Sequence, residues 1–303
     1  KILFESINAT CDSLFNPERF KNNVQLLPDS LLGDSLYAII NVSVTPIKDK
    51  PSHSSQIIDQ GIMGNQLKLL RFENGWYLSQ THYDYVGWVN QTAIQIFNSN
   101  QIKDWDSSNL VRVSIISDHI YSKPNLDSQP ISDIVLNNKL KLVNKNVDWS
   151  LIQLPDKRFG YIKNTSFIKE TEKIQNPIQT RLRLAHQMMG TPYLWGGNSS
   201  KGNDCSGFTQ NIFEASGIQL PRDARQQALY GKEIIPDNIW SNIQPGDLLF
   251  FGKENRVTHV GMSLGQYDFI HQGGMVTINS LAKNSIVFAP KRFDTFLFIK
   301  RIH

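Results

Sequence analysis

A cysteine in the last third of the chain has the sequence context of a nucleophile. Cys205 follows Asp204 and precedes a segment of helical spacing that ends near Gly217. Aspartate is a favourable helix cap, so Cys205 is expected at the first helical position. The partial positive charge of a helix N-terminus stabilises a thiolate and lowers the pKa of a cysteine placed there. Cys205 is therefore a candidate nucleophile.

His259 and His271 lie in two segments that alternate like β-strands. They are 12 residues apart (271 − 259 = 12), with Gly265 midway between them. Antiparallel strands joined near Gly265 would pair the two histidines on one face of a sheet. In this arrangement Cys205 attacks a carbonyl carbon. His259 forms an ion pair with the Cys205 thiolate and later protonates the leaving amine. His271 would hold His259 in one tautomer.

Other roles for these side chains are open. If Cys205 is the nucleophile, its backbone N–H and a donor such as Tyr193 or Ser206 would hold the oxyanion. A free cysteine is, however, commonly a small buried hydrophobic residue. Cysteine and histidine also bind zinc, but the chain has no closely spaced ligand pair, so we predict no metal and no other cofactor. Cys11 is expected to be a free or buried thiol.

Composition excludes several classes of protein. The chain has 303 residues, of which 40% are hydrophobic and 19% charged, so it is expected to fold into roughly two domains. Two cysteines do not make a disulfide scaffold. The net charge of +4 without a block of Lys and Arg does not favour nucleic-acid binding. No apolar run is long enough to predict a membrane span.

An internal repeat organises the first half of the chain. Shifting the sequence by 73 positions aligns two segments without a gap (149 − 76 = 73). The matched residues are Lys50-Pro51 with Lys123-Pro124, Ser55-Gln56 with Ser128-Gln129, Asn65 with Asn138, Leu67-Lys68-Leu69 with Leu140-Lys141-Leu142, Trp76 with Trp149, Leu78 with Leu151, Gln80 with Gln153, and Gly87 with Gly160. Two copies are too few for a solenoid, so they indicate two similar small domains in tandem.

Each copy of the repeat has the pattern of a small all-β barrel. Leu67 and Leu69, then Trp76 and Leu78, alternate with a period of two, and Asn74-Gly75 predicts a hairpin turn between them. After Pro177 the pattern changes to helical segments followed by strands, which indicates an α+β domain. The predicted limits are an N-terminal arm at 1–34, barrels at 35–98 and 108–170, and a catalytic domain at 176–303.

The blocks around the candidate nucleophile resemble the NlpC-type cell-wall peptidases, a papain-like bacterial family. The blocks are Gly190-Thr191-Pro192-Tyr193-Leu194-Trp195-Gly196-Gly197, Asp204-Cys205-Ser206-Gly207-Phe208, Leu220-Pro221-Arg222, Pro245-Gly246-Asp247-Leu248-Leu249-Phe250-Phe251, His259-Val260-Gly261 and Phe269-Ile270-His271. The repeats resemble bacterial SH3-like domains. The resemblance implies an α+β fold in which two small all-β SH3-like barrels precede a papain-like catalytic domain.

The combination of domains is similar to a subgroup that hydrolyses the bond between D-glutamate and a diamino acid in peptidoglycan stem peptides. The resemblance implies that Tyr85 of the first barrel lines the site and that Asp223 helps to hold a free N-terminal amine. Tyr193, Asp204 and Ser206 match further substrate-binding positions. The subgroup often has a glutamate where this chain has Asn65, which weakens the expected demand for a free N-terminus.

The resemblance also implies partners and a location. Peptidoglycan-derived peptides are the expected substrates, and neither a nucleic-acid partner nor a membrane span is expected. The oligomeric state is left open, with a monomer favoured. The resemblance implies a bacterial protein that is exported or lies in the cell envelope, either periplasmic or lipid-anchored. A cytoplasmic location is left open. The alternatives are a cell-wall-binding protein without activity, and an acyltransferase, thioesterase or amidase on the same fold.

Overall fold

Residues 25–254 and 256–302 are described by a computed structural model of the chain. Cys11, in the predicted N-terminal arm, lies outside these residues. The described end of the N-terminal arm holds a single 3-10 turn, η1 (Ser30–Leu32). The Asp29 N–H donates to the Leu70 carbonyl oxygen at 2.7 Å, so this end packs on the first barrel.

The first barrel is an antiparallel sheet with the strand order β3-β2-β6-β5-β4-β1-β7. Its elements are β1 (Tyr37–Ile40), β2 (Val44–Lys48), β3 (Ile57–Ile62), β4 (Gln66–Glu73), β5 (Trp76–Thr81), β6 (Val86–Asn90), the 3-10 turn η2 (Gln91–Ala93) and β7 (Ile94–Phe97). Asn74 and Gly75, with φ of 50° and 83°, form the predicted hairpin turn between β4 and β5. Both residues need positive φ in such a turn, which explains the Asn-Gly pair.

The second barrel repeats this topology strand for strand, in the order β10-β9-β13-β12-β11-β8-β14. It follows the short helix α2 (Ser99–Asp106) and comprises β8 (Leu110–Val113), β9 (Ser117–Tyr121), β10 (Pro130–Val135), β11 (Lys139–Lys145), β12 (Trp149–Gln153), β13 (Phe159–Lys163), η3 (Asn164–Ser166) and β14 (Phe167–Lys169). The shared order confirms that the offset of 73 residues marks a structural repeat.

The third part is an α+β domain, as predicted. Its six-stranded antiparallel sheet has the order β17-β22-β18-β19-β20-β21. The elements are α3 (Pro177–Gln187), β15 (Asn198–Ser199), β16 (Gly202–Asn203), α4 (Cys205–Ala215), α5 (Ala224–Gln227), β17 (Lys232–Ile234), β18 (Leu248–Lys253), β19 (Arg256–Gly265), β20 (Asp268–Gln272), β21 (Val276–Ser280), α6 (Pro290–Asp294) and β22 (Phe296–Arg301). Among the helices of the described residues, none is both long and apolar enough to cross a membrane.

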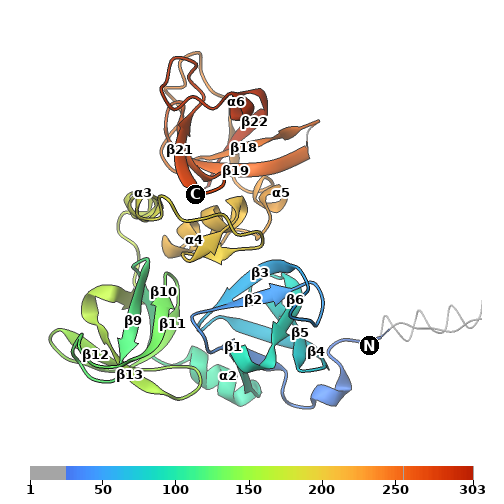
Figure 1. The fold of residues 1–303 in the computed structure, drawn as a ribbon, viewed down its shortest axis with the longest axis vertical. Coiled ribbons are helices and arrows are strands. Elements are labelled where there is room, and N and C mark those ends of the chain that lie inside the picture. Colours follow the sequence, from blue (N-terminus) through green and yellow to red (C-terminus); the bar gives the residue numbers. More distant parts are fainter. Residues whose placement is uncertain (1–24, 255, 303) are drawn as a thin grey trace, which may run out of the picture.

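Helix α4 is the central element of the molecule. One of its sides packs on the sheet, where Phe208 and Ile212 are fully buried against Phe250 and Val260. Figure 1 shows α4 between this sheet and the two barrels. The second barrel contacts the C-terminal half of α4, where Asn137 Nδ2 donates to the Asn211 carbonyl oxygen at 2.9 Å. The barrels therefore support the helix on the side that the sheet leaves open.

Candidate active site

Cys205 occupies the first position of α4, as the sequence predicts. Asp204 is the N-cap, and its Oδ1 accepts a hydrogen bond from the Gly207 N–H at 2.8 Å. The thiol is largely buried, and the backbone N–H groups of Ser206 and Val260 lie within hydrogen-bonding reach of it. Val260 directly follows His259 on β19, so the helix start and the histidine strand meet at the sulfur.

The two histidines form a directed chain of hydrogen bonds with Asn279. The Asn279 Nδ2 donates to the Val287 carbonyl oxygen at 3.2 Å, so its Oδ1 must be the acceptor for His271 Nε2, at 2.8 Å. His271 Nδ1 is then unprotonated and accepts from His259 Nε2 at 2.8 Å. This leaves His259 Nδ1 without a proton. The sequence analysis did not single out Asn279. It lies in β21, directly after Ile278, which pairs with Ile270 of β20.

The predicted pairing of His259 directly opposite His271 is wrong by two residues. Met262 pairs with Ile270 and Ser263 with Phe269, so residue numbers across the hairpin add to 532 and the residue opposite His271 would be 261. The turn extends beyond Gly265 to Gln266, which also has a positive φ of 51°. A shift of two residues keeps both side chains on one face of the sheet, because side chains alternate with a period of two. The histidines therefore meet diagonally.

Burial makes the neutral forms of the thiol and the imidazoles the stable ones. Burial raises the pKa of the Cys205 thiol, and the neighbouring Asp204 charge raises it further. The backbone N–H groups of Val260 and Ser206 lower this pKa, but by less. Burial lowers the pKa of His259 well below its usual value, and the Arg292 charge adds to this. For His271, burial lowers the pKa to about 4. Desolvation thus opposes the thiolate–imidazolium pair that the helix N-terminus predicts.

A cleft of about 480 Å³ opens beside the thiol. It is lined by Tyr85, Tyr193, Asp204, Cys205, Ser206 and Asp223, which are all of the predicted site residues except the two histidines. Thr258, directly before His259, also lines it. Burial raises the pKa of Tyr85 to about 12, and the Asp223 charge adds to this, so the tyrosine keeps its hydroxyl proton. The cleft thus has walls from the first barrel and from the catalytic domain.

Ser206 lines the cleft with a hydroxyl that is already hydrogen-bonded, and Asn65 lies away from the cleft. The Ser206 hydroxyl donates to Asp204 Oδ1 at 3.2 Å and is only 5% exposed. Of the two side chains predicted to hold an oxyanion, Tyr193 is the less constrained. Asn65 is buried in the turn between β3 and β4 and does not line the cleft, so its amide is not a substitute for a carboxylate there.

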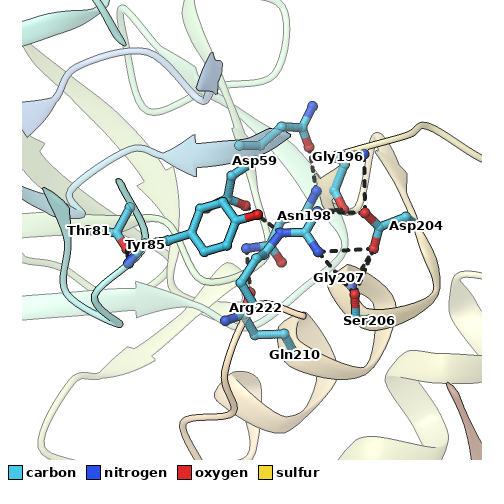
Figure 2. A network of polar contacts seen from close by, with 12 residues as sticks. Asp59, Thr81, Tyr85, Gly196, Asn198, Asp204, Ser206, Gly207, Gln210 and Arg222 are labelled. Atoms are coloured by element: carbon cyan, nitrogen blue, oxygen red, sulfur yellow. Dashed lines mark hydrogen bonds and ion pairs between the residues drawn. The ribbon is translucent and has the colours of Figure 1, made fainter. Parts of the chain in front are cut away.

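Arg222 is a part of the site for which the sequence predicted no role. Its guanidinium donates to both carboxylate oxygens of Asp204, at 2.7 and 3.0 Å, and to Asp59 of the first barrel at 2.6 Å. Figure 2 shows Arg222 between these two carboxylates. Within the described residues, no group of three His, Cys, Asp or Glu side chains is arranged to hold a metal ion.

Comparison with known proteins identifies two regions of the chain. Residues 190–288 match the NlpC/P60 family, and residues 47–94 match the bacterial dipeptidyl-peptidase SH3 domain. The second match covers the first barrel, so it shows one SH3 domain and not the two that were predicted.

Relatives and solved structures agree with these matches. The chain is 27% identical to dipeptidyl-peptidase 6 of Lysinibacillus sphaericus over 261 residues, which are 80% of this chain and 91% of that protein. It is 41% identical to a probable endopeptidase of Haemophilus influenzae over 113 residues, 34% of this chain and 68% of that one. An NlpC/P60 family structure from Bacillus cereus superposes with a TM-score of 0.75 at 21% identity, covering 88% of this chain and 99% of the other.

A papain-like domain with a cysteine at the start of its central helix and a histidine pair on its sheet defines a hydrolase of the peptidase class. The chain belongs to the NlpC/P60 family.

Proposed function

We propose that this peptidase uses Cys205 to hydrolyse the bond between γ-D-glutamate and the diamino acid in peptidoglycan stem peptides. The observation that carries the proposal is the histidine chain, because it leaves His259 Nδ1 unprotonated on the strand whose next residue, Val260, reaches the thiol with its backbone N–H. The name of a Bacillus cereus relative, γ-D-glutamyl-L-lysine dipeptidyl-peptidase, supports the substrate class; it is 24% identical over 234 residues.

The proposed reaction begins from a neutral thiol and a neutral imidazole. His259 Nδ1 accepts the thiol proton as Cys205 Sγ bonds to the γ-carbonyl carbon of D-glutamate. The resulting imidazolium donates this proton to the nitrogen of the diamino acid, and the C–N bond breaks to leave a thioester. Water then attacks the thioester, giving one proton to His259, which returns it to the departing thiolate. His271 and Asn279 hold His259 in the tautomer that each step needs.

The proposed specificity is for stem peptides that begin with a free L-alanine. Tyr85 and Asp223 line the same cleft as the thiol, and the Asp223 carboxylate can pair with an ammonium there. A peptide still attached to sugar through its N-terminus has no ammonium to offer. Sites of this kind favour peptides released from the cell wall, and we propose a bacterial cell-envelope or extracellular location for the enzyme.

Digestion of defined peptides tests this proposal. The test compares L-Ala-γ-D-Glu-L-Lys with its N-acetylated form, followed by mass spectrometry in the presence and absence of a chelator. We expect release of L-Ala-γ-D-Glu and lysine from the free peptide, about ten- to hundredfold slower cleavage of the acetylated one, and no effect of the chelator. Equal rates on both peptides would contradict the free-amine specificity. Loss of activity with the chelator would contradict the mechanism.

A further inference from the structure

Arg222 connects the first barrel to the start of the catalytic helix through ions that are almost completely buried. The exposed fraction is 1% for the Arg222 side chain and 0% for Asp59. Arg222 Nε donates to Asp59 Oδ1 at 2.6 Å, and the two terminal nitrogens donate to the carboxylate of Asp204 at 3.0 and 2.7 Å. A planar guanidinium held at both ends has a fixed position and a fixed plane.

The barrel end of this connection is itself held by a second side chain. The Tyr83 hydroxyl donates to Asp59 Oδ2 at 2.5 Å, so both oxygens of this carboxylate are bonded. Burial raises the pKa of Asp59, and the Arg222 charge opposes this rise. Because removing one member of a buried ion pair leaves an uncompensated charge, Asp59 and Arg222 depend on each other.

At the other end of the connection, the Asp204 carboxylate controls the position of Cys205. The carboxylate of Asp204 accepts the Gly207 N–H from the first turn of α4 at 2.8 Å. It also accepts the Gly196 N–H from the loop that lines the cleft at 3.1 Å. A rotation of this carboxylate would break one of these bonds and move the helix start relative to that loop. The orientation of Asp204 therefore sets the position of the thiol.

The repeat shows that these acidic and phenolic side chains are particular to the first barrel. The offset of 73 places Asp59 on Ser132 (59 + 73 = 132) and Tyr83 on Asp156 (83 + 73 = 156). The second copy therefore has neither the aspartate nor the tyrosine at the equivalent positions, which are Ser132 and Asp156. A buried carboxylate is costly to a small barrel, and the barrel fold evidently does not require one here. The pair therefore has a purpose outside the barrel.

We propose that Asp59 is a positioning residue of the active site: through Arg222 it orients Asp204 and thereby the start of the helix that carries Cys205. This inference rests on the proposed role of Cys205. It makes the first barrel a working part of the catalytic centre as well as a wall of the cleft. Asp59 does not line the cleft, and the contact by which it reaches Asp204 is Arg222.

The test compares Asp59→Asn and Asp59→Ala with a matched control. Asp133→Asn removes the partner of Lys201 in another ion pair between a barrel and the catalytic domain, one whose side chains are 39% and 49% exposed. For each variant we would measure kcat and KM on L-Ala-γ-D-Glu-L-Lys, the unfolding temperature, and the rate of Cys205 alkylation by iodoacetamide as a function of pH. Alkylation needs no peptide substrate, so it tests Asp59 even if the proposed substrate is wrong.

Asp59→Ala is expected to lower kcat by about ten- to hundredfold with KM changing less, because displacement of a reacting group by a fraction of an ångström is costly. The alkylation profile is expected to shift. Asp59→Asn keeps an oxygen for Arg222 and should lose less than Asp59→Ala, and Asp133→Asn should match the wild type. An Asp59→Ala protein with a lower unfolding temperature but wild-type kcat and alkylation profile would show a merely structural role. If Asp59→Ala does not fold, wild-type values for both Asp59→Asn and Tyr83→Phe would overturn the proposal.

Discussion

The side chain of Asn279 determines which nitrogen of each active-site histidine carries a proton. Its amide is oriented by the Val287 carbonyl oxygen, and its Oδ1 can only accept from His271. In this chain of hydrogen bonds the two ring protons lie on His271 Nε2 and His259 Nε2. His259 Nδ1 is therefore unprotonated. Asn279 thus selects the tautomer of His259, the proposed base.

Removing this amide should reduce turnover without removing the base. We expect Asn279→Ala to lower kcat by about ten- to hundredfold, because His271 can then adopt the opposite tautomer and stop accepting from His259. The measurement is kcat on the free tripeptide. The control is Asn242→Ala, which removes an amide bonded to the Ile235 carbonyl oxygen outside the cleft. A wild-type kcat for Asn279→Ala would refute the tautomer assignment.

His271 also predicts how stability depends on pH. Its pKa is lowered by burial to about 4 in the folded protein, against about 6.5 in the unfolded chain. Between these values the unfolded chain binds more protons, so the free energy of unfolding falls as the pH decreases from about 6.5 to about 4. The shift corresponds to about 3 kcal/mol at most. Unfolding temperatures measured across this range should decrease, and less steeply for His271→Gln. An identical slope in the variant would exclude this cause.

At the scale of elements, local patterns predicted more than pairings did. The aspartate cap, the helix start at Cys205 and the Asn74-Gly75 turn each depend on neighbouring residues, and the structure confirms all three. The register of the histidine hairpin was wrong because it depends on how many residues the turn uses, which Gly265 alone does not determine. The face of each histidine was still correct, since the error was an even number of residues.

The first turn of α4 leaves no space for a side chain at Gly207. A Cβ atom there would lie 2.0 Å from the Gly197 carbonyl oxygen, so Gly207→Ala must move either the helix start or the cleft loop. We expect almost complete loss of activity and a lower unfolding temperature. Gly217→Ala is the comparison, because its Cβ would meet nothing within 4 Å and only its positive φ of 90° is strained, at about 1–2 kcal/mol. Equal activity in the two variants would contradict the tight packing of the helix start.

At the scale of the whole molecule, the repeat predicted the architecture but not the contacts between its parts. The offset of 73 gave two barrels, and the NlpC-type blocks gave the papain-like domain. Asp59 and Arg222 are 163 residues apart, and nothing in either local sequence links them. Such contacts depend on how folded domains dock. A divergence between the two copies, as at Tyr85 and Arg158, is the signal that remains in the sequence.

The same divergence provides a matched pair of variants for specificity. Tyr85 lines the cleft, whereas Arg158 at the equivalent position of the second barrel does not. We expect Tyr85→Ala to reduce the preference for the free tripeptide over its N-acetylated form by about tenfold, because part of the cleft wall from the first barrel is removed. Arg158→Ala should leave the preference unchanged. The measurement is the ratio of kcat/KM values for the two peptides. An unchanged ratio in Tyr85→Ala would show that this side chain does not take part in selection.

The central claim is that Cys205 carries out the hydrolysis through a thioester. The most direct measurement is mass spectrometry of the intact protein and of the products after L-Ala-γ-D-Glu-L-Lys is mixed with the wild type or with Cys205→Ala and quenched in acid. We predict that the wild type releases L-Ala-γ-D-Glu and lysine and carries the dipeptidyl group on Cys205, while the folded Cys205→Ala protein does neither. Release of the same two products by Cys205→Ala at the wild-type rate would contradict the claim.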